Sequence, residues 1–184
     1  MAIIVGVDEV GRGCWAGPLV AGAVILAKPI KGLRDSKKLS ALQRTKLADA
    51  IHKTAHVSLG WVTAAEVDSL GLTAAVTLAM QRAVDGITIP YDQIIIDGNY
   101  NFLPHHSRTT TLVGGDDLEP AISAASILAK VARDEYMVNL AKQLPGYGFE
   151  KHVGYGTALH RQALNQLGVA SEHRKSYKPV QAFL

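Results

Sequence analysis

The chain has 184 residues, of which 48% are hydrophobic and 19% charged, a composition typical of one soluble globular domain spanning residues 1–184. No apolar stretch is long enough to cross a bilayer, the N-terminus lacks a secretion signal, and the single cysteine excludes an internal disulfide framework, so we expect a cytoplasmic protein with no membrane partner. Because 19 basic residues stand against 16 acidic ones, the net charge of +3 gives only weak support for a polyanionic partner.

The apolar and polar patterns predict an alternation of strands and helices. In chain order the predicted elements are strands over residues 3–7 and 19–26, a polar loop over 33–38, a helix from 41 to about 54, a strand over 56–61, a helix from 64 to about 71, a helix over 73–84, strands over 94–97 and 109–113, and helices over 120–144 and 157–167. The tail after residue 171 is basic and is expected to be irregular.

Two helix starts are marked by capping boxes. Ser40 with Gln43, and Thr63 with Glu66, have the spacing at which side chain and backbone cap each other. Together the elements predict an α/β fold with a mixed five-stranded sheet flanked by helices, and a helical C-terminal part over roughly residues 140–184.

Acidic residues follow three of the predicted strands. Asp8 and Glu9 end the first, Asp97 ends the fourth, and Asp116 and Asp117 follow the fifth. Adjacent carboxylates repel one another, and a hard divalent cation is the usual compensation. Two-metal phosphodiester hydrolysis needs three or four such acids around cations that lie about 3.5–4 Å apart. We therefore interpret the acids at residues 8, 9 and 97 as a metal site, whereas the acid at 117, taken alone, is better explained as a turn residue.

A glycine motif directly follows the first acidic pair. Gly11-Arg12-Gly13 together with Ala16 matches a dinucleotide-binding pattern, but that pattern should open a helix, and here a strand follows Pro18. The neighbouring acids would also repel a pyrophosphate. The motif instead favours close backbone approach to a sugar-phosphate, with the arginine available for a phosphate, and a plain tight turn remains the alternative.

Two further segments offer groups for nucleic acid. Ser36 and Lys37 provide a hydroxyl and an ammonium group suited to phosphates, unless they form only a solvated charged loop. Tyr155 lies between two glycines, so its ring is either open for stacking or buried in a loop. Seven histidines raise the alternative of metal-free RNA cleavage by an acid/base pair, but none stands in a recognisable pairing context.

Taken in order, these motifs resemble the ribonuclease HII family, the type 2 ribonucleases H, over nearly the whole chain. The matching segments cover residues 7–18, 34–39, 96–98, 115–116, 123–134, 152–157 and 173–177. The resemblance implies a ribonuclease H-like fold, hydrolysis of RNA in RNA–DNA hybrids, and incision on the 5′ side of single ribonucleotides embedded in duplex DNA, as in ribonucleotide excision during DNA replication and repair.

The resemblance also implies a role for each matching position. It implies two Mg²⁺ or Mn²⁺ ions held by Asp8, Glu9, Asp97 and Asp116, with Asp117 as an extra acid that is no ligand. It implies that Gly11, Arg12 and Gly13 read the 2′-hydroxyl, that Tyr155 contacts the same nucleotide, and that Ser36 and Lys37 hold phosphates. One departure is Gly114, where relatives often carry lysine.

Other interpretations stay open at this point. A nuclease of the same fold that resolves DNA junctions would share the strand-end acids, and a non-catalytic module would bind hybrids without cleaving them. Residues 181–184 form either a short hydrophobic peptide for a sliding clamp or a plain terminal segment. We expect the protein to be a monomer.

Overall fold

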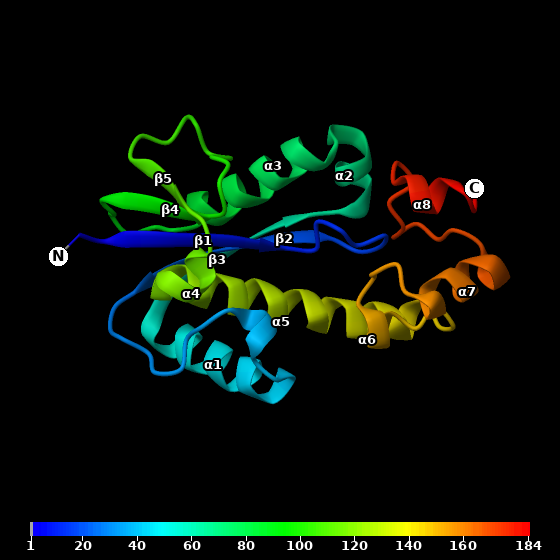
Figure 1. Cartoon of the computed structure of the whole chain (residues 1–184), viewed down its shortest axis with the longest axis horizontal. Coiled ribbons are helices and arrows are strands. Elements are labelled where there is room, and N and C mark those ends of the chain that lie inside the picture. The colour runs from blue at the N-terminus through cyan, green and yellow to red at the C-terminus, as the bar shows by residue number, and fades with distance from the viewer. Residues whose placement is uncertain (1) are drawn as a thin grey trace.

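The computed structural model describes residues 2–184, and its centre is a mixed five-stranded sheet (Figure 1). The sheet order is β3-β2-β1-β4-β5, in which β1 is antiparallel to β2 and parallel to β4. The strands are β1 (Ile4–Val10), β2 (Leu19–Leu26), β3 (Ala55–Val62), β4 (Gln93–Asp97) and β5 (Thr109–Leu112). The predicted α/β class and mixed five-stranded sheet are confirmed.

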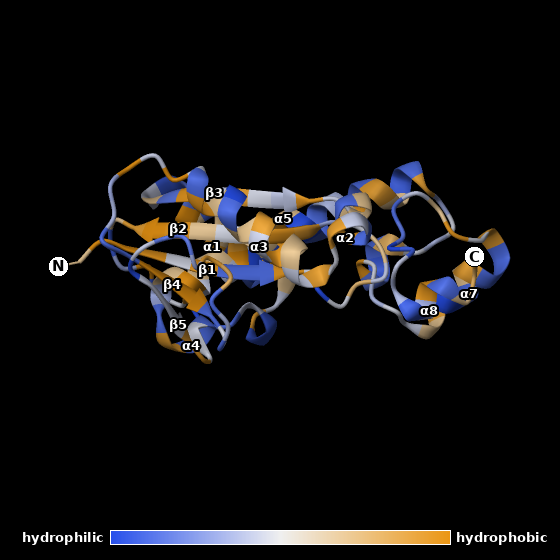
Figure 2. Cartoon of the chain, turned by 90° about the horizontal axis from the view of Figure 1, so that it is seen from above, coloured by the Kyte–Doolittle hydropathy of each residue, from blue (hydrophilic) through white to orange (hydrophobic). Residues whose placement is uncertain are grey.

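Helices cover both faces of the sheet (Figure 1). One face carries α2 (Ala64–Leu70) and α3 (Leu72–Asp85), and the other carries α1 (Ala41–Thr54) and the long α5 (Pro120–Gln143). Figure 2 shows hydrophobic residues along β2 and β4, which supply side chains to the layer beneath α3. Strands β1, β2 and β3 therefore lie between two helical layers.

Glycines allow α5 to lie directly on the sheet. A Cβ at Gly6 would overlap the backbone of Ala121, and a Cβ at Gly22 would lie 2.6 Å from the carbonyl oxygen of Ala125. On the opposite face, a Cβ at Gly60 would overlap the backbone of α3 at Ala79. Close packing of this kind brings the polar groups of α5 within reach of the β1 side chains.

Both predicted capping boxes are confirmed, but several boundaries and short elements differ from the prediction. Strand β1 runs on to Val10, so the first acidic pair lies inside the strand rather than after it. Short helices occur where a loop or an irregular tail was expected: η1 (Ser36–Lys38), α4 (Gly115–Leu118), α6 (Phe149–His152) and α8 (Lys178–Gln181). Helices of one turn are too short to show a hydrophobic period, so the sequence pattern misses them.

The C-terminal part is helical, as predicted, and lies at the end of the molecule remote from the N-terminus (Figure 1). It consists of α6, α7 (Ala158–Leu167) and α8, which pack with the end of α5 around Phe149, Leu164 and Val180. Because α5 also covers the sheet, it contributes buried side chains both to this C-terminal cluster and to the hydrophobic cluster between the sheet and α1. Within residues 2–184, no helix combines the length and apolarity that a membrane crossing needs.

Candidate active site

Two of the predicted acids meet on neighbouring parallel strands. Val7 of β1 pairs with Ile96 of β4, so the next residues, Asp8 and Asp97, lie side by side where the pairing of these two strands ends. The backbone N–H of Gly115 donates to Asp97 Oδ1 over 2.8 Å, which brings the start of α4 to the same edge. Three segments that are distant in the sequence therefore converge there.

Burial and mutual repulsion mark these acids as a group. Asp8 is 7% exposed and Asp116 is 8% exposed. Burial, and then the charge of Glu9, raise the pKa of Asp8 to about 8. Burial raises the pKa of Glu9 and of Asp116 as well, and the charge of Asp97 adds to the rise in both. Each carboxyl group thus lies in a place that favours a positive partner.

Lys37 supplies one positive charge to this acidic edge. Its Nζ lies 3.8 Å from Asp116 Oδ2 and 3.9 Å from Asp35 Oδ1, although 80% of the side chain is exposed. Burial alone would lower the pKa of Lys37, but the carboxylates of Asp35, Asp116 and Asp8 raise it. Lys37 is therefore charged and exposed, and its ammonium group lies beside the acids. A group that contacts a phosphate needs both the charge and the exposure.

Ser36, the other residue of this loop that was predicted to contact a phosphate, is buried. The residue is 4% exposed, and its Oγ lies 2.9 Å from the Oγ of Ser126 on α5. A hydrogen bond from Ser126 also lowers the pKa of Asp8, against the larger effect of burial. The Ser36 hydroxyl therefore links its loop to α5 beside Asp8, because the single-turn helix η1 turns the side chain into the protein.

Asp117 is occupied by the same loop. Its Oδ1 accepts from the backbone N–H of Asp35 over 3.3 Å, and its Oδ2 forms an ion pair with Lys38. Asp117 therefore tethers the loop of residues 35–38 to α4.

The donor chemistry of the acidic edge suits hard divalent cations. Carboxylate oxygens without sulfur are the ligands that Mg²⁺ and Mn²⁺ prefer. Within residues 2–184, however, no three histidine, cysteine, aspartate or glutamate side chains are arranged closely enough to form a complete cation cage. Glu9 pairs with Arg12, whose Nη1 lies 3.0 Å from Glu9 Oε1.

The glycine motif adjoins the acids through this ion pair. Gly11 has a φ of +94°, and a Cβ there would lie 2.5 Å from Nε of Arg133. Gly13 is exposed, and a Cβ there would meet nothing within 4 Å. The first glycine is therefore required by the fold, while the second leaves an open backbone surface.

Tyr155 lies next to the glycine motif. Its side chain is 43% exposed, and burial, then the neighbouring Cys14 thiol, raises its pKa. The backbone N–H of Trp15 donates to Gly154 O over 2.8 Å, and a Cβ at Gly156 would overlap the Trp15 ring. The loop that carries Tyr155 is thus clamped onto the segment that follows residues 11–13.

Sequence reasoning missed two arginines that hold these loops. Arg133 and Arg174 are both 0% exposed. Arg133 donates to the carbonyl oxygens of residues 16, 18 and 153, and Arg174 donates to those of residues 12 and 17. For Arg133, the sequence held a signal that could have revealed it: a charged residue on the face of the predicted long helix that also carries the apolar residues. Lys130, by contrast, pairs with Asp134 at 2.7 Å.

The histidines also depart from the expectation. His160 and His173 are buried, and their Nε2 atoms lie 3.0 Å apart, although the sequence showed no pairing context. The partners are thirteen residues apart and meet only because the segment after α7 turns back toward it.

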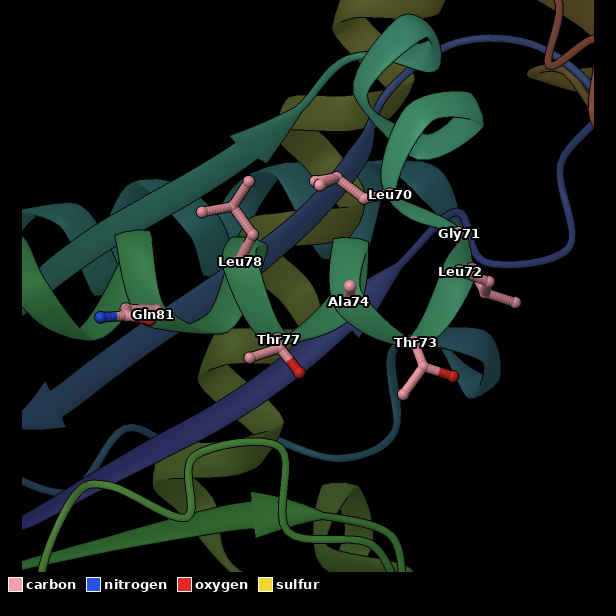
Figure 3. A pocket seen from close by; sticks show the side chains of 8 residues that line it. All are labelled: Leu70, Gly71, Leu72, Thr73, Ala74, Thr77, Leu78 and Gln81. Atoms are coloured by element: carbon pink, nitrogen blue, oxygen red, sulfur yellow. The ribbon is translucent and has the colours of Figure 1, made fainter.

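One surface pocket is lined by none of these groups. It measures about 720 Å³ and lies where α2 meets α3, lined by Leu70, Leu72 and Leu78 with Thr73 and Thr77 (Figure 3). None of the acids contributes to it.

Comparison with known proteins identifies the family. The family description Ribonuclease HII matches residues 5–180. Ribonuclease HII of Halorhodospira halophila (strain DSM 244 / SL1) is 50% identical over 186 residues, which cover 98% of this chain and 94% of that protein. Ribonuclease HII of Jannaschia sp. (strain CCS1) is 48% identical over 185 residues, which cover 99% and 92%.

Solved structures support the fold. Ribonuclease H2 from Pyrococcus horikoshii OT3 has a TM-score of 0.82 at 24% identity and covers 98% of this chain and 96% of its own. The PCNA:RNase HII complex from Archaeoglobus fulgidus gives 0.79 at 24% identity, with 96% and 95% covered. Bst-RNase HIII in complex with Mn²⁺ gives 0.74 at 19% identity, with 98% and 68% covered. The ribonuclease H-like fold is confirmed, and the extent and identity of the sequence matches show that this chain belongs to the ribonuclease HII family.

Proposed function

We propose that this protein hydrolyses RNA in RNA–DNA hybrids and incises on the 5′ side of single ribonucleotides embedded in duplex DNA. One observation carries the proposal. Acids from β1, β4 and α4, of which Asp8 and Asp116 are buried, converge at one edge of the sheet, beside an exposed lysine and next to the glycine motif. An acidic edge with adjoining basic groups suits a phosphodiester substrate that needs metal ions.

In the proposed site, Asp8, Glu9, Asp97 and Asp116 hold two Mg²⁺ or Mn²⁺ ions. When bound, such ions activate water for in-line attack and stabilise the leaving 3′ oxygen, which gives 5′-phosphate and 3′-hydroxyl ends. The Mn²⁺ bound by Bst-RNase HIII, a structural neighbour, supports this choice of metal. The burial of Asp8 makes a bound cation more favourable, because the carboxylate gains little from water there.

The remaining groups recognise the substrate in this proposal. Lys37 contacts a backbone phosphate, since its ammonium group is exposed beside Asp116. The open backbone at Gly13 and its neighbours in the motif approach the 2′-hydroxyl, and the half-exposed ring of Tyr155 packs on the same nucleotide. Ser36 contributes to phosphate binding in this proposal, and its hydroxyl also holds the Lys37 loop on α5. A site that pairs with the ribose hydroxyl discriminates against deoxyribose, because its polar groups lose their partner there.

A labelled duplex with one embedded ribonucleotide tests the proposal. We expect a single cut on the 5′ side of the ribonucleotide with Mg²⁺ or Mn²⁺, no cut with EDTA, and no cut in the matched all-DNA duplex. A 2′,3′-cyclic phosphate product would instead indicate a histidine mechanism. Cleavage of branched DNA without ribose would support a junction-resolving nuclease, and binding without divalent-dependent cleavage would support a non-catalytic module.

Clamp binding is a further part of the proposal on partners. The Archaeoglobus fulgidus relative was solved in a complex with PCNA. In this chain, Val180 is buried and Phe183 packs against the C-terminal cluster, while Leu184 is exposed. Use of the tail as a clamp peptide would therefore require Phe183 to leave its contacts. Deletion of residues 181–184 should abolish binding of a purified sliding clamp if the tail is the contact. We further propose that the protein acts as a cytoplasmic monomer.

A further inference from the structure

Three buried histidines form a compact group beneath the loop that carries Tyr155. The rings of His152 and His160 stack with centroids 4.4 Å apart, and the His160 and His173 Nε2 atoms lie 3.0 Å apart. His160 is 0% exposed and His173 is 1% exposed. The pair is packed against the aromatic ring of Phe149, without an acidic partner in its hydrogen bonds.

The hydrogen bonds of the pair define a direction. The backbone N–H of Ala170 donates to His173 Nδ1 over 3.0 Å, so the proton of neutral His173 is on Nε2. That N–H donates to His160 Nε2, which leaves the proton of neutral His160 on Nδ1. His160 Nδ1 then donates to the carbonyl oxygen of Tyr155 over 3.0 Å.

The opposite arrangement fails at the last bond. If His173 carried its proton on Nδ1 and donated to the Ala170 carbonyl oxygen, 3.3 Å away, His160 would have to donate from Nε2. Neutral His160 would then present an unprotonated Nδ1 to the Tyr155 carbonyl oxygen, and two acceptors would face each other. With neutral rings, the first assignment makes every bond from the Ala170 N–H to the Tyr155 carbonyl oxygen, and it leaves only the longer 3.3 Å contact between His173 Nδ1 and the Ala170 carbonyl oxygen without a proton. Burial lowers the pKa of both histidines to about 4.

The chain ends on the backbone of the residue proposed to contact the substrate. The Tyr155 carbonyl accepts from Thr157 N–H over 2.8 Å and from His160, while the Tyr155 N–H donates to His152 O over 2.9 Å. The next residue, Gly156, lies against the Trp15 ring, and the Tyr155 side chain reaches toward Cys14. The direction of the Tyr155 ring therefore depends on how firmly this carbonyl is held.

We propose that His160 and His173 are positioning residues that hold Tyr155 in place for the ribonucleotide through a directional hydrogen-bond chain. This inference rests on the proposed function, in which Tyr155 contacts the nucleotide. The histidines touch no substrate and exchange no proton with it. They affect the cleavage rate only by holding Tyr155, so a change at either histidine should matter little once the tyrosine ring is removed.

A double-mutant cycle tests the condition. In the wild-type background, His160→Leu should lower kcat/KM on the single-ribonucleotide duplex about tenfold, because a small misplacement of a substrate-contacting group costs that order of rate. In a Tyr155→Ala background, the same change should cost less than about twofold, because residues that act through one another are not additive. His160→Asn, whose amide N–H takes the place of Nδ1–H, should restore most of the activity.

Leu164→Ala is the matched control. Leu164 lies on α7 and is 2% exposed in the same hydrophobic cluster, but it has no polar link to Tyr155. Its effect on cleavage should be equal in both backgrounds. Equal losses from His160→Leu in both backgrounds would overturn the positioning role and leave the proposed function standing. A silent Tyr155→Ala would overturn the positioning role and the proposed Tyr155 contact while the cleavage activity stands, whereas a wild-type protein that does not cut the duplex would overturn the proposed function itself.

Nitrogen-15 NMR of the unmodified protein gives a second test that needs no activity and no variant. At pH 7 we expect neutral rings, with His173 protonated at Nε2 and His160 at Nδ1. A His160 ring protonated at Nε2, or a charged ring in either residue, would overturn the chain even if cleavage proceeds as proposed.

Discussion

Gly11 and Gly13 belong to one motif but have different reasons to be glycine. At Gly11 the backbone has a positive φ and a Cβ would collide with Arg133, so the fold itself excludes a side chain. At Gly13 a Cβ would meet only open space, and no intramolecular contact explains the residue. A requirement for glycine there would come from a ligand.

The two glycines therefore separate folding from function. Gly13→Ala should leave the free energy of unfolding within about 0.5 kcal/mol of the wild type, yet lower kcat/KM on a single-ribonucleotide duplex about tenfold. Gly11→Ala should lower the free energy of unfolding by more than about 1 kcal/mol, because the chain is forced into a disfavoured conformation. Urea unfolding and cleavage rates measure both effects. Normal cleavage by a stable Gly13→Ala protein would contradict backbone approach at this position.

The Asp8 carboxylate destabilises the fold, because it is buried beside other acids, but the same position suits a carboxylate that binds a cation. Asp8→Asn keeps the shape and removes the charge, so in EDTA the melting temperature should rise by about 2–4 °C for each kcal/mol of relieved repulsion. The variant should lose both cleavage and the stabilisation that Mn²⁺ gives the wild type. Asp117→Asn is the control, since its acid is occupied by the loop and should leave the Mn²⁺ effect intact. Near-normal turnover by Asp8→Asn would remove the metal proposal.

For single residues, the sequence predicts which acids lie together better than it predicts which way a side chain points. Strand-end position was enough to bring Asp8 and Asp97 together, because parallel strands end at the same edge. The inward turn of Ser36 and the burial of Arg174 depend on contacts between segments more than eighty residues apart. Local sequence carries no record of such contacts.

The short helix η1 presents the ammonium group of Lys37 to the substrate in the proposed function. Lys37 is exposed at the acidic edge, so Lys37→Ala should remove one phosphate contact. The slope of log binding constant against log salt should become shallower by about 0.9, the value for one neutralised phosphate in a B-form duplex. Lys53→Ala is the control, because this lysine ends α1 next to the start of β3, away from the acids. Binding isotherms in EDTA over a range of salt concentrations measure both. An unchanged slope in Lys37→Ala would exclude the contact.

The elements themselves were predictable where their signals are local. Ser40 and Thr63 each open a helix with the expected reciprocal cap, and the apolar runs became strands. The short helix α4 was not predictable in this way. It follows Gly114, whose φ of +68° turns the chain, and it is held by the bond from Gly115 to Asp97. A bond across the sheet edge, rather than helix propensity, forms the element that presents Asp116.

For the molecule as a whole, the buried histidine pair links stability to pH. Both rings have a pKa of about 4 in the folded protein and an ordinary value near 6.5 in the unfolded chain. Below pH 6.5 the unfolded chain binds protons that the folded protein does not, so stability falls as the pH falls, until both folded rings titrate near pH 4. His152 is the neighbouring titratable ring, and its Nε2 and Nδ1 are both hydrogen-bonded to the backbone.

The titration of Asp8 changes stability with pH in the opposite direction, so the effect of the histidines is measured in a variant that lacks the Asp8 carboxyl group. Its folded pKa of about 8 lies above the unfolded value of 3.8, so the folded protein binds the extra proton and stability rises as the pH falls between these values. Glu66, with a pKa lowered to about 2, loses its contribution only below its unfolded value of 4.5 and does not act in the window above pH 5.

The measurement is therefore made in an Asp8→Asn background between pH 6.5 and pH 5. The free energy of unfolding from urea titration should fall by about 3 kcal/mol for the histidine pair, because each ring binds a proton in the unfolded chain but stays neutral in the folded protein over most of this window. Replacing both rings, in His160→Leu/His173→Leu, should flatten the profile whatever it does to absolute stability. A slope that survives the double replacement would place the acid sensitivity elsewhere in the molecule, and a flat profile in the parent would mean that the two rings accept protons inside the folded protein.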